Sequence, residues 1–212
     1  MLIEVSGSEE SVSERLQTFM GRKLNLENDS VLIASNKSQE REMWAMREQV
    51  PTCLMDLSRQ HGGRLYKYDL SLTMPQMHEV VSALQDRLNE EKSYKFPSLN
   101  IEVCNFGHCG DLNLHLNILA RPRASHERTH GDLESLPSQL DALQGVLDEC
   151  IAKEVTARRG SLSAEHGVGQ LKKKYMTLAR SEEEVSLMRA IKKVFDPAGI
   201  LNPTTMLDVQ SV

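Results

Sequence analysis

The sequence has no apolar run of the length that a membrane-spanning helix needs, so we expect no transmembrane segment. It also has no excess of basic residues, since 25 Lys and Arg stand against 30 Asp and Glu, for a formal charge of -5 at pH 7. The basic residues are scattered among the acidic ones and form no patch suited to nucleic acid or an anionic membrane. We therefore expect neither as a partner.

Cysteines are few, and none of them form the CxxC pairs typical of redox or zinc motifs. No signal peptide or targeting segment opens the chain, and residues 1–5 are typical of a strand already under way, as in a chain that starts in mid-protein. We predict free thiols in a reducing compartment, and we favour a structural thiol over a metal ligand at position 109. The four are Cys53, Cys104, Cys109 and Cys150.

At 212 residues, 40% hydrophobic and 26% charged, the chain has the composition of a folded globular domain. Apolar alternation and short apolar runs predict strands at residues 1–5, 31–35, 64–72, 101–106 and 113–118. A period of 3.6 predicts helices at residues 8–20, 36–50, 75–88, 140–157 and 182–195, with a polar loop at 121–137. This order predicts an α+β fold in which helices cover one side of a largely antiparallel sheet.

Residues 107–117 contain the first candidate site. Asn113, His115 and Asn117 alternate with apolar residues, so they share the polar face of a strand. The glycines at 107 and 110 predict a turn that brings His108 back toward that face, where two imidazoles could meet over one metal ion. A spacing of seven also fits one side of a helix, although the glycines argue against it. Two unrelated histidines are the other alternative, and a metal site needs a third ligand.

Residues 160–169 contain the second candidate site. Glu165 supplies the missing carboxylate, and with His108 and His115 it would form a set of two histidines and one acid. Such a set leaves one coordination position open, as catalytic zinc sites do. His166 would then remain free as a base, and the glycines at 167 and 169 would let the backbone approach a flat ligand. We expect the lysines at 172–174 to form a solvated face.

Arg47 and Pro51 mark an irregular place in the second predicted helix. Pro51 cannot donate a hydrogen bond to the carbonyl of Arg47, so we expect the helix to kink or stop there. An arginine near a helix end is usually solvated, but its fork also fits a carboxylate. From these residues alone, both readings of Arg47 stay open.

Five segments, in order, resemble the C-terminal half of D-2-hydroxyglutarate dehydrogenases, which are FAD-linked oxidoreductases of the vanillyl-alcohol-oxidase type. They are residues 44–48, 66–71, 107–117, 163–169 and 199–203. The resemblance covers essentially the whole chain. It is closer to the hydroxyglutarate branch than to the related D-lactate dehydrogenases, because of Lys67 and the polar alternation at 113–117. It implies a ferredoxin-like C-terminal domain over residues 1–212, without the N-terminal FAD-binding domain.

The resemblance also implies a role for individual residues. It makes His108, His115 and Glu165 zinc ligands and His166 the catalytic histidine. It implies that zinc polarises the 2-hydroxyl of the substrate, that His166 takes the proton, and that hydride passes to the flavin. The implied substrate-binding residues are Arg47, Thr52, Lys67 and Asn117, and the implied flavin-side residues are Gly167 and Asn202.

Two positions depart from the family pattern. Pro51 stands where the family has a threonine, with Thr52 as a substitute, and Leu112 replaces a glycine in the histidine turn. A side chain at position 112 is unexpected where the backbone needs freedom. We therefore expect Leu112 either to adopt an allowed conformation or to alter the turn.

The favoured hypothesis is the substrate and zinc half of a flavin-dependent D-2-hydroxyacid dehydrogenase that oxidises D-2-hydroxyglutarate to 2-oxoglutarate, with a flavin-binding domain as its partner. The alternatives are a D-lactate dehydrogenase and a non-catalytic binding or scaffold protein, since some family members have been named as actin-interacting proteins. The resemblance implies a mitochondrial location, with a cytoplasmic one as the alternative, and it is compatible with a homodimer. One zinc per chain would separate the enzyme from the scaffold.

Overall fold

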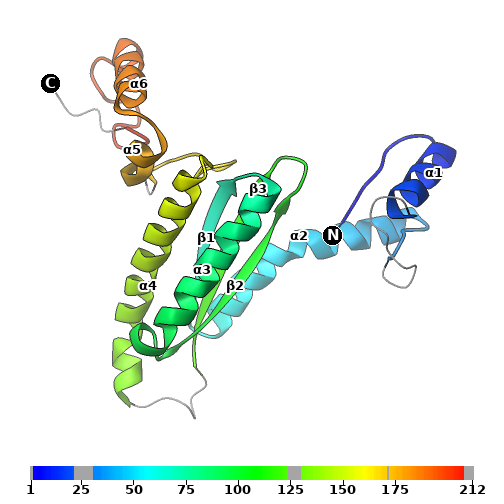
Figure 1. The fold of residues 1–212 in the computed structure, drawn as a ribbon, viewed down its shortest axis with the longest axis horizontal. Helices are drawn as coiled ribbons and strands as arrows, with labels where there is room; N and C mark the ends of the chain where they lie inside the picture. The colour runs from blue at the N-terminus through cyan, green and yellow to red at the C-terminus, as the bar shows by residue number, and fades with distance from the viewer. Residues whose placement is uncertain (1, 22–30, 124–129, 171, 208–212) are drawn as a thin grey trace. The chain divides into compact units, whose positions relative to one another are not determined.

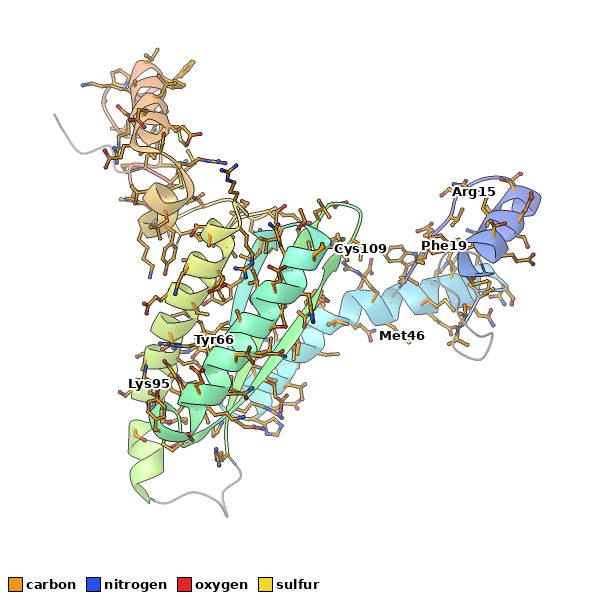
Figure 2. The ribbon with its side chains drawn as sticks, viewed as in Figure 1. Arg15, Phe19, Met46, Tyr66, Lys95 and Cys109 are labelled. Atoms are coloured by element: carbon orange, nitrogen blue, oxygen red, sulfur yellow. The ribbon has the colours of Figure 1, made fainter. Side chains whose placement is uncertain are left out.

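The computed structural model describes residues 2–21, 31–123, 130–170 and 172–207. The chain divides into two compact units, Met1–Asp56 and Leu57–Val212, and each is described by itself. Among the described residues, no helix combines the length and the apolar character that crossing a bilayer requires. All four cysteines are free thiols, as predicted. The expectation of a buried or half-buried structural thiol at Cys109 is wrong, because this residue is exposed at a hairpin tip (Figure 2).

The first unit contains α1 (Glu9–Phe19) and most of α2 (Lys37–Gln60). The strands predicted near residues 1–5 and 31–35 are wrong, because residues 2–5 and 31–35 form no strand. Leu32 is 85% exposed, and an apolar run becomes a strand only where another strand pairs its N–H and C=O groups. Of the two outcomes expected at Pro51, a kink or a stop, the stop is wrong, since α2 continues to Gln60, and the kink stays a prediction. Proline removes only its own N–H bond, and the later residues still donate to carbonyls one turn back.

The second unit is built on a three-stranded antiparallel sheet. Its strands are β1 (Arg64–Ser71), β2 (Leu99–His108) and β3 (Asn113–Pro122), in the order β1-β3-β2. β2 and β3 form a hairpin, and α3 (Met74–Lys95) connects β1 to β2. The predicted α+β class and the antiparallel sheet are therefore confirmed. The finer ferredoxin-like assignment stays a prediction, since the described residues contribute three strands.

Two long helices cover one face of this sheet, α3 and α4 (His130–Ala157), as Figure 1 shows. The loop prediction for residues 121–137 is wrong at both ends, because β3 runs to Pro122 and α4 begins at His130; residues 124–129 lie outside the described structure. The core consists of the inward side chains of β1 and β3 and the facing side chains of both helices. Its fully buried members include Leu70, Leu84, Leu116, Ile118, Leu143 and Leu147.

Buried polar groups on this covered face find partners. Tyr66 (labelled in Figure 2) donates from its hydroxyl to the carbonyl of Leu140 at 2.6 Å. The Tyr68 hydroxyl donates to the Asp148 carboxylate at 2.8 Å. Burial raises the pKa of Tyr66 to about 12 and also raises that of Tyr68, so both hydroxyls stay protonated donors. The face under α3 and α4 is therefore apolar, with its hydrogen bonds satisfied.

The chain ends with a loop, a short helix α5 (Met176–Ala179) and α6 (Glu182–Phe195). Ser181 caps α6, because its hydroxyl accepts from the backbone N–H of Glu184 while the Glu184 carboxylate accepts from the N–H of Ser181. This is the reciprocal capping box that a Ser-x-x-Glu spacing favours. The predicted helix at 182–195 is thus confirmed.

Candidate functional site

The face of the sheet opposite α3 and α4 carries the polar side chains that the alternation predicted. In β3, Asn113, His115 and Asn117 lie directly opposite Ser71, Asp69 and Lys67 of β1. On the other side of β3, His108 pairs with Asn113 and Phe106 pairs with His115. Directly opposed residues of antiparallel strands share a face, so three strands contribute to one polar surface.

The β2–β3 hairpin places His108 beside His115. Gly107 lies inside β2, and a Cβ there would come within 2.1 Å of the Asn113 carbonyl oxygen, so only glycine fits. The turn therefore lies at residues 109–112 and begins two residues later than predicted, and His108 ends the strand. Leu112 has a φ of 55°, which is the left-handed conformation that favours glycine. The turn is thus kept, and the leucine adopts the strained conformation.

His108, His115 and Glu165 converge on one point. One ligand atom of each lies within 4.8 Å of the others, and His108 Nε2 is 3.7 Å from Glu165 Oε1. The two imidazole rings meet edge to face, with centroids 5.2 Å apart and an angle of 82°. In a tetrahedral zinc site, bonds of about 2.0–2.2 Å place ligand atoms about 3.3–3.6 Å apart. The three side chains therefore fit a divalent metal after small rotations.

Glu165 reaches this place because its loop is tied to the edge of β1. Ser161 and Ser71 exchange two backbone hydrogen bonds, of 3.0 and 2.8 Å. Further along, Asp69 Oδ2 accepts from the backbone N–H of Glu165 at 2.8 Å and from that of His166 at 2.9 Å. The loop therefore follows β1 and delivers an acid to the two histidines of the hairpin.

His166 lies beside the cluster on its exposed side. Its ring stacks over that of His115, with centroids 6.0 Å apart and an interplanar angle of 14°. Its Nδ1 is 3.9 Å from Asp69 Oδ2, and its side chain is 66% exposed. Gly167 follows with a φ of 72°, a conformation that strongly favours glycine. An exposed imidazole next to the three converging side chains is placed to exchange protons with a bound molecule.

The electrostatics of the cluster suit metal binding. Burial lowers the pKa of His115, so this imidazole is neutral near pH 7, which is the state that binds a metal. Burial acts to raise the pKa of Asp69, but the backbone N–H groups of His166 and Glu165 outweigh it and hold that pKa below its usual range. Asp69 is therefore an anion inside the protein, beneath the site.

The prediction of a solvated lysine face at 172–174 is wrong for Lys172. Its ammonium group is enclosed and has no hydrogen-bond partner within the described part of the chain. Burial lowers its pKa, and Asp69 acts in the opposite direction. By contrast, Lys174 is exposed and pairs with Asp148 at 3.1 Å. Sequence spacing could not distinguish the two lysines, because enclosure depends on the loop that folds over β1.

Two of the four predicted substrate residues lie on the polar face. Lys67 is exposed and sits opposite Asn117, one step along the polar face from the pair of Asp69 and His115. Asn117 is 5% exposed and donates from its side-chain amide to the His115 carbonyl at 3.1 Å. Arg47 and Thr52 belong to the first compact unit, so their roles remain predictions.

Asn202 lies in the turns after α6 and has a φ of 46°. Its segment is joined to the loop that follows His166, because the Met206 N–H donates to the Gly169 carbonyl at 2.8 Å. Gln170 also donates from its side chain to the hydroxyl of Thr204 at 2.9 Å. These bonds connect the segment to the site loop, and the flavin-side role of Asn202 remains a prediction.

Two further residues of the polar face received no role from the sequence, although the alternation at 113–117 had placed Asn113 on that face. Asn113 is 3% exposed, and neither polar atom of its side chain has a hydrogen-bond partner among the residues described. Asp69 is 2% exposed, and its second oxygen, Oδ1, also lacks such a partner. The alternation of β1 and β3 placed both on the polar face, and that was the only available signal. A buried polar atom without a protein partner can bind a water molecule, an ion or a ligand.

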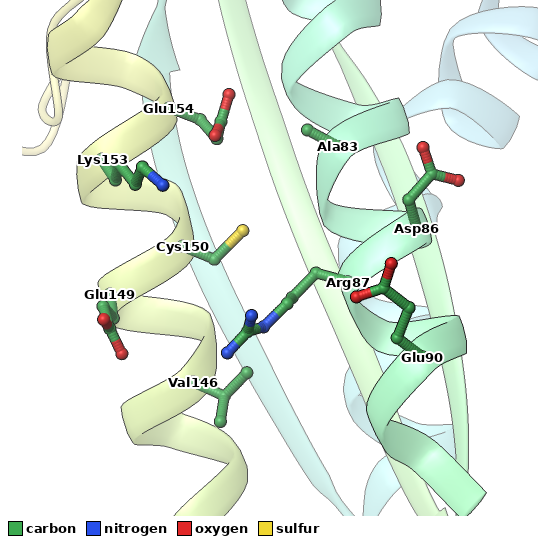
Figure 3. Close-up of a pocket in the computed structure, with 9 residues that line it drawn as sticks. All are labelled: Ala83, Asp86, Arg87, Glu90, Val146, Glu149, Cys150, Lys153 and Glu154. Atoms are coloured by element: carbon green, nitrogen blue, oxygen red, sulfur yellow. The ribbon is translucent and has the colours of Figure 1, made fainter.

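A pocket of about 260 Å³ also opens between α3 and α4 (Figure 3). Its lining mixes acidic and basic side chains with Val146 and Cys150 and shares no residue with the cluster. The chemistry-bearing histidines lie on the other face of the sheet, so we assign no function to this pocket.

Comparison with known proteins identifies the family of the chain. Residues 1–206 match the family described as FAD linked oxidases, C-terminal domain. A protein of Arabidopsis thaliana named as a mitochondrial D-2-hydroxyglutarate dehydrogenase is 35% identical over 98% of this chain and 32% of the relative. A Schizosaccharomyces pombe protein, named provisionally as a mitochondrial D-lactate dehydrogenase, is 35% identical over 96% of this chain and 36% of the relative.

A third relative, named as a D-2-hydroxyglutarate–pyruvate transhydrogenase, comes from Saccharomyces cerevisiae and is 33% identical over 96% of this chain and 37% of its own length. The chain thus spans about a third of the length of the curated relatives it matches. The resemblance drawn from the five sequence segments is confirmed. Because the family model matches residues 1–206, the chain belongs to the family of FAD-linked oxidase C-terminal domains.

Proposed function

We propose that this chain is the substrate- and metal-binding part of a flavin-dependent D-2-hydroxyacid dehydrogenase, with D-2-hydroxyglutarate as its substrate and 2-oxoglutarate as the product. The observation that carries the proposal is the convergence of His108, His115 and Glu165, with His166 stacked beside them. Two imidazoles and one carboxylate leave an open coordination position, which suits a substrate. The family match and the names of the relatives support the reaction class.

When bound, a zinc ion would polarise the 2-hydroxyl of the substrate, and FAD would accept the hydride that leaves C2 with its two electrons. The chain itself supplies the remaining functions. His115 and His108 would hold the metal through their imidazoles, and Glu165 would add the negative charge. His166 accepts the hydroxyl proton, because it is an exposed imidazole next to the metal-binding side chains. The hydroxy acid thereby loses one proton and one hydride.

The second carboxylate of D-2-hydroxyglutarate needs a cation at a distance from the metal. Lys67 meets that need, since it is exposed on the polar face two residues from Asp69, which pairs with His115. We assign Asn117, Arg47 and Thr52 to the same substrate as hydrogen-bond donors, with Arg47 as a second cation. One relative is named as a D-lactate dehydrogenase, which favours the D-lactate alternative. D-lactate, however, has no second carboxylate for Lys67 to bind.

We assign Gly167 and Asn202 to the part of the site that faces the flavin. We also propose a flavin-binding domain as the partner of this chain. We propose a ferredoxin-like fold for the second unit, supported by its βαββα order, which contains five of the six elements of the βαββαβ pattern. The names of two relatives support a mitochondrial location, with a cytoplasmic one as the alternative. A homodimer and an actin-binding or scaffold role stay predictions, and the enzyme names of the relatives do not favour the scaffold.

Zinc titration of the metal-free 212-residue chain tests the metal site. We expect one zinc per chain, with binding lost in His108→Ala and Glu165→Ala. His78→Ala is the matched control, because His78 lies exposed on α3, which covers the other face. Absence of zinc binding by the parent chain, or equal loss in His78→Ala, would refute the proposal.

Substrate choice is tested on the zinc-loaded chain by calorimetry. We expect D-2-hydroxyglutarate to bind more tightly than D-lactate, and Lys67→Met to reduce that preference about tenfold or more while leaving D-lactate binding unchanged. Equal affinity of the parent chain for both acids would instead support the D-lactate reading.

A further inference from the structure

Asp69 is a buried acid, and none of the roles assigned so far explains it. It lies in β1 directly opposite His115, on the polar face of the sheet, and is 2% exposed. Placing an ionised carboxylate in such a position is unfavourable unless hydrogen bonds or an opposite charge compensate. The compensation that this carboxylate receives comes from the loop that carries the site.

Three consecutive backbone N–H groups of that loop are directed at Asp69. Ala164 donates to its backbone carbonyl at 3.3 Å, and Glu165 and His166 donate to its Oδ2 at 2.8 and 2.9 Å. Hydrogen bonds to an ionised acceptor are stronger than those to a neutral one. The backbone positions of Glu165 and His166 are therefore set by one carboxylate oxygen.

The opposite charge comes from further along the same loop. Lys172 has an enclosed ammonium group that interacts electrostatically with Asp69. Its backbone N–H donates to the Val168 carbonyl at 3.3 Å, so it belongs to the turn that follows His166.

We propose that Asp69 is the positioning residue of the site, which fixes the metal-binding Glu165 and the proton-accepting His166 through their backbone N–H groups. The proposal rests on the proposed function for the roles of Glu165 and His166. In this proposal Asp69 acts through these two residues and the metal ligands are His108, His115 and Glu165, although Asp69, Glu165 and His166 form a second group with the spacing of metal ligands. Its Oδ2 already accepts two hydrogen bonds, and its strand position opposite His115 places it beneath the ligands.

Substitutions at Asp69 separate these roles. Asp69→Ala removes both acceptor oxygens, whereas Asp69→Asn keeps one neutral acceptor of the same shape. In the metal-free chain, we expect amide hydrogen exchange at Glu165 and His166 to rise about tenfold or more in Asp69→Ala and about fivefold in Asp69→Asn. Zinc affinity should fall about tenfold or more in Asp69→Ala and only a few fold in Asp69→Asn.

Asp148→Asn is the matched control, since Asp148 is also a hydrogen-bonded, largely covered carboxylate but lies on α4. It should leave the exchange of the two amides and the zinc affinity unchanged. If Asp69→Ala does not fold, as judged by circular dichroism, Asp69→Asn decides the test by the exchange of the same two amides.

Unchanged exchange at Glu165 and His166 in the folded variants would overturn the proposal. Loss of zinc in Asp69→Asn as complete as in His108→Ala would also overturn it, because Asp69 would then be a ligand. If the parent chain binds no zinc, the proposed metal function fails, whereas the amide exchange still decides whether Asp69 positions the loop. The two failures are therefore distinguishable.

Discussion

The two faces of the sheet in the second unit are built from alternate residues of the same strands, and they differ in how their polar groups are satisfied. On the face under α3 and α4, the hydroxyls of Tyr66 and Tyr68 have hydrogen-bond partners. On the opposite face, the amide of Asn113 and one oxygen of Asp69 have none within the described residues. The covered face is therefore optimised for stability, whereas the polar face keeps binding capacity for a ligand.

The largest effect on stability is expected from the covered face. Leu116 is fully buried there, so Leu116→Ala should lower the free energy of unfolding by about 2–5 kcal/mol, measured by denaturant titration. Leu187→Ala is the control, because Leu187 is 65% exposed on α6 and should change stability by less than about 0.5 kcal/mol. A similar loss in both variants would show that Leu116 is not part of the core.

On the polar face we expect a large loss of zinc affinity with little change in stability. Glu165→Gln keeps the size of the side chain but removes the charge that a divalent ion needs, so zinc affinity should fall about a hundredfold. Its unfolding free energy without metal should stay within about 0.5 kcal/mol of the parent, because Glu165 is exposed. Competition with a chelator measures the first quantity and urea titration the second. Destabilisation equal to that of Leu116→Ala would remove the distinction between the faces.

A smaller effect is expected at the edge of the covered face and depends on pH. Burial acts to raise the pKa of Asp148, but hydrogen bonds from Tyr68, Gln144 and Lys174 outweigh it and lower that pKa. A carboxyl whose pKa is lower in the folded state stabilises the protein above its unfolded pKa of about 3.9, and this contribution is lost as pH falls through the folded value.

Asp148→Asn should therefore cost about 1–3 kcal/mol at pH 7, and its difference from the parent should shrink as the pH falls from about 5 to below 3. Urea titrations across this range measure it. Asp86→Asn, at an exposed position on α3, controls for the substitution itself. A difference between Asp148→Asn and the parent that is constant with pH would contradict the assigned hydrogen bonds.

The smallest effect is expected at the hairpin that joins the two strands. Leu112 has a left-handed backbone and is 39% exposed, so Leu112→Gly removes strain and little packing. The unfolding free energy should rise by about 0.5–1 kcal/mol, with the zinc affinity kept. Gly110→Ala, in the same turn, controls for hairpin substitutions in general. A loss of stability in Leu112→Gly would mean that the leucine side chain packs in a way that outweighs the strain.

Much of the second unit could be predicted from the sequence, because strand alternation and helix period are local properties. The alternation at 113–118 assigned each side chain of β3 to the correct face. The ligand types also named His108, His115 and Glu165, which the structure brings together. Two of the failed predictions concern the first unit. The apolar run that contains Leu32 forms no strand, because a strand needs a second strand to pair with, and α2 continues past Pro51.

The sequence by itself determined which residues could bind a metal or a proton and which face of β3 they occupy, because these follow from side-chain chemistry and a period of two. Only the tertiary structure decided that Glu165 reaches the histidines and that Asp69 holds its loop. Those contacts join residues 96 and 97 positions apart through backbone N–H groups, and a backbone N–H is present at nearly every residue. No sequence pattern therefore predicts which backbone N–H groups will donate to Asp69.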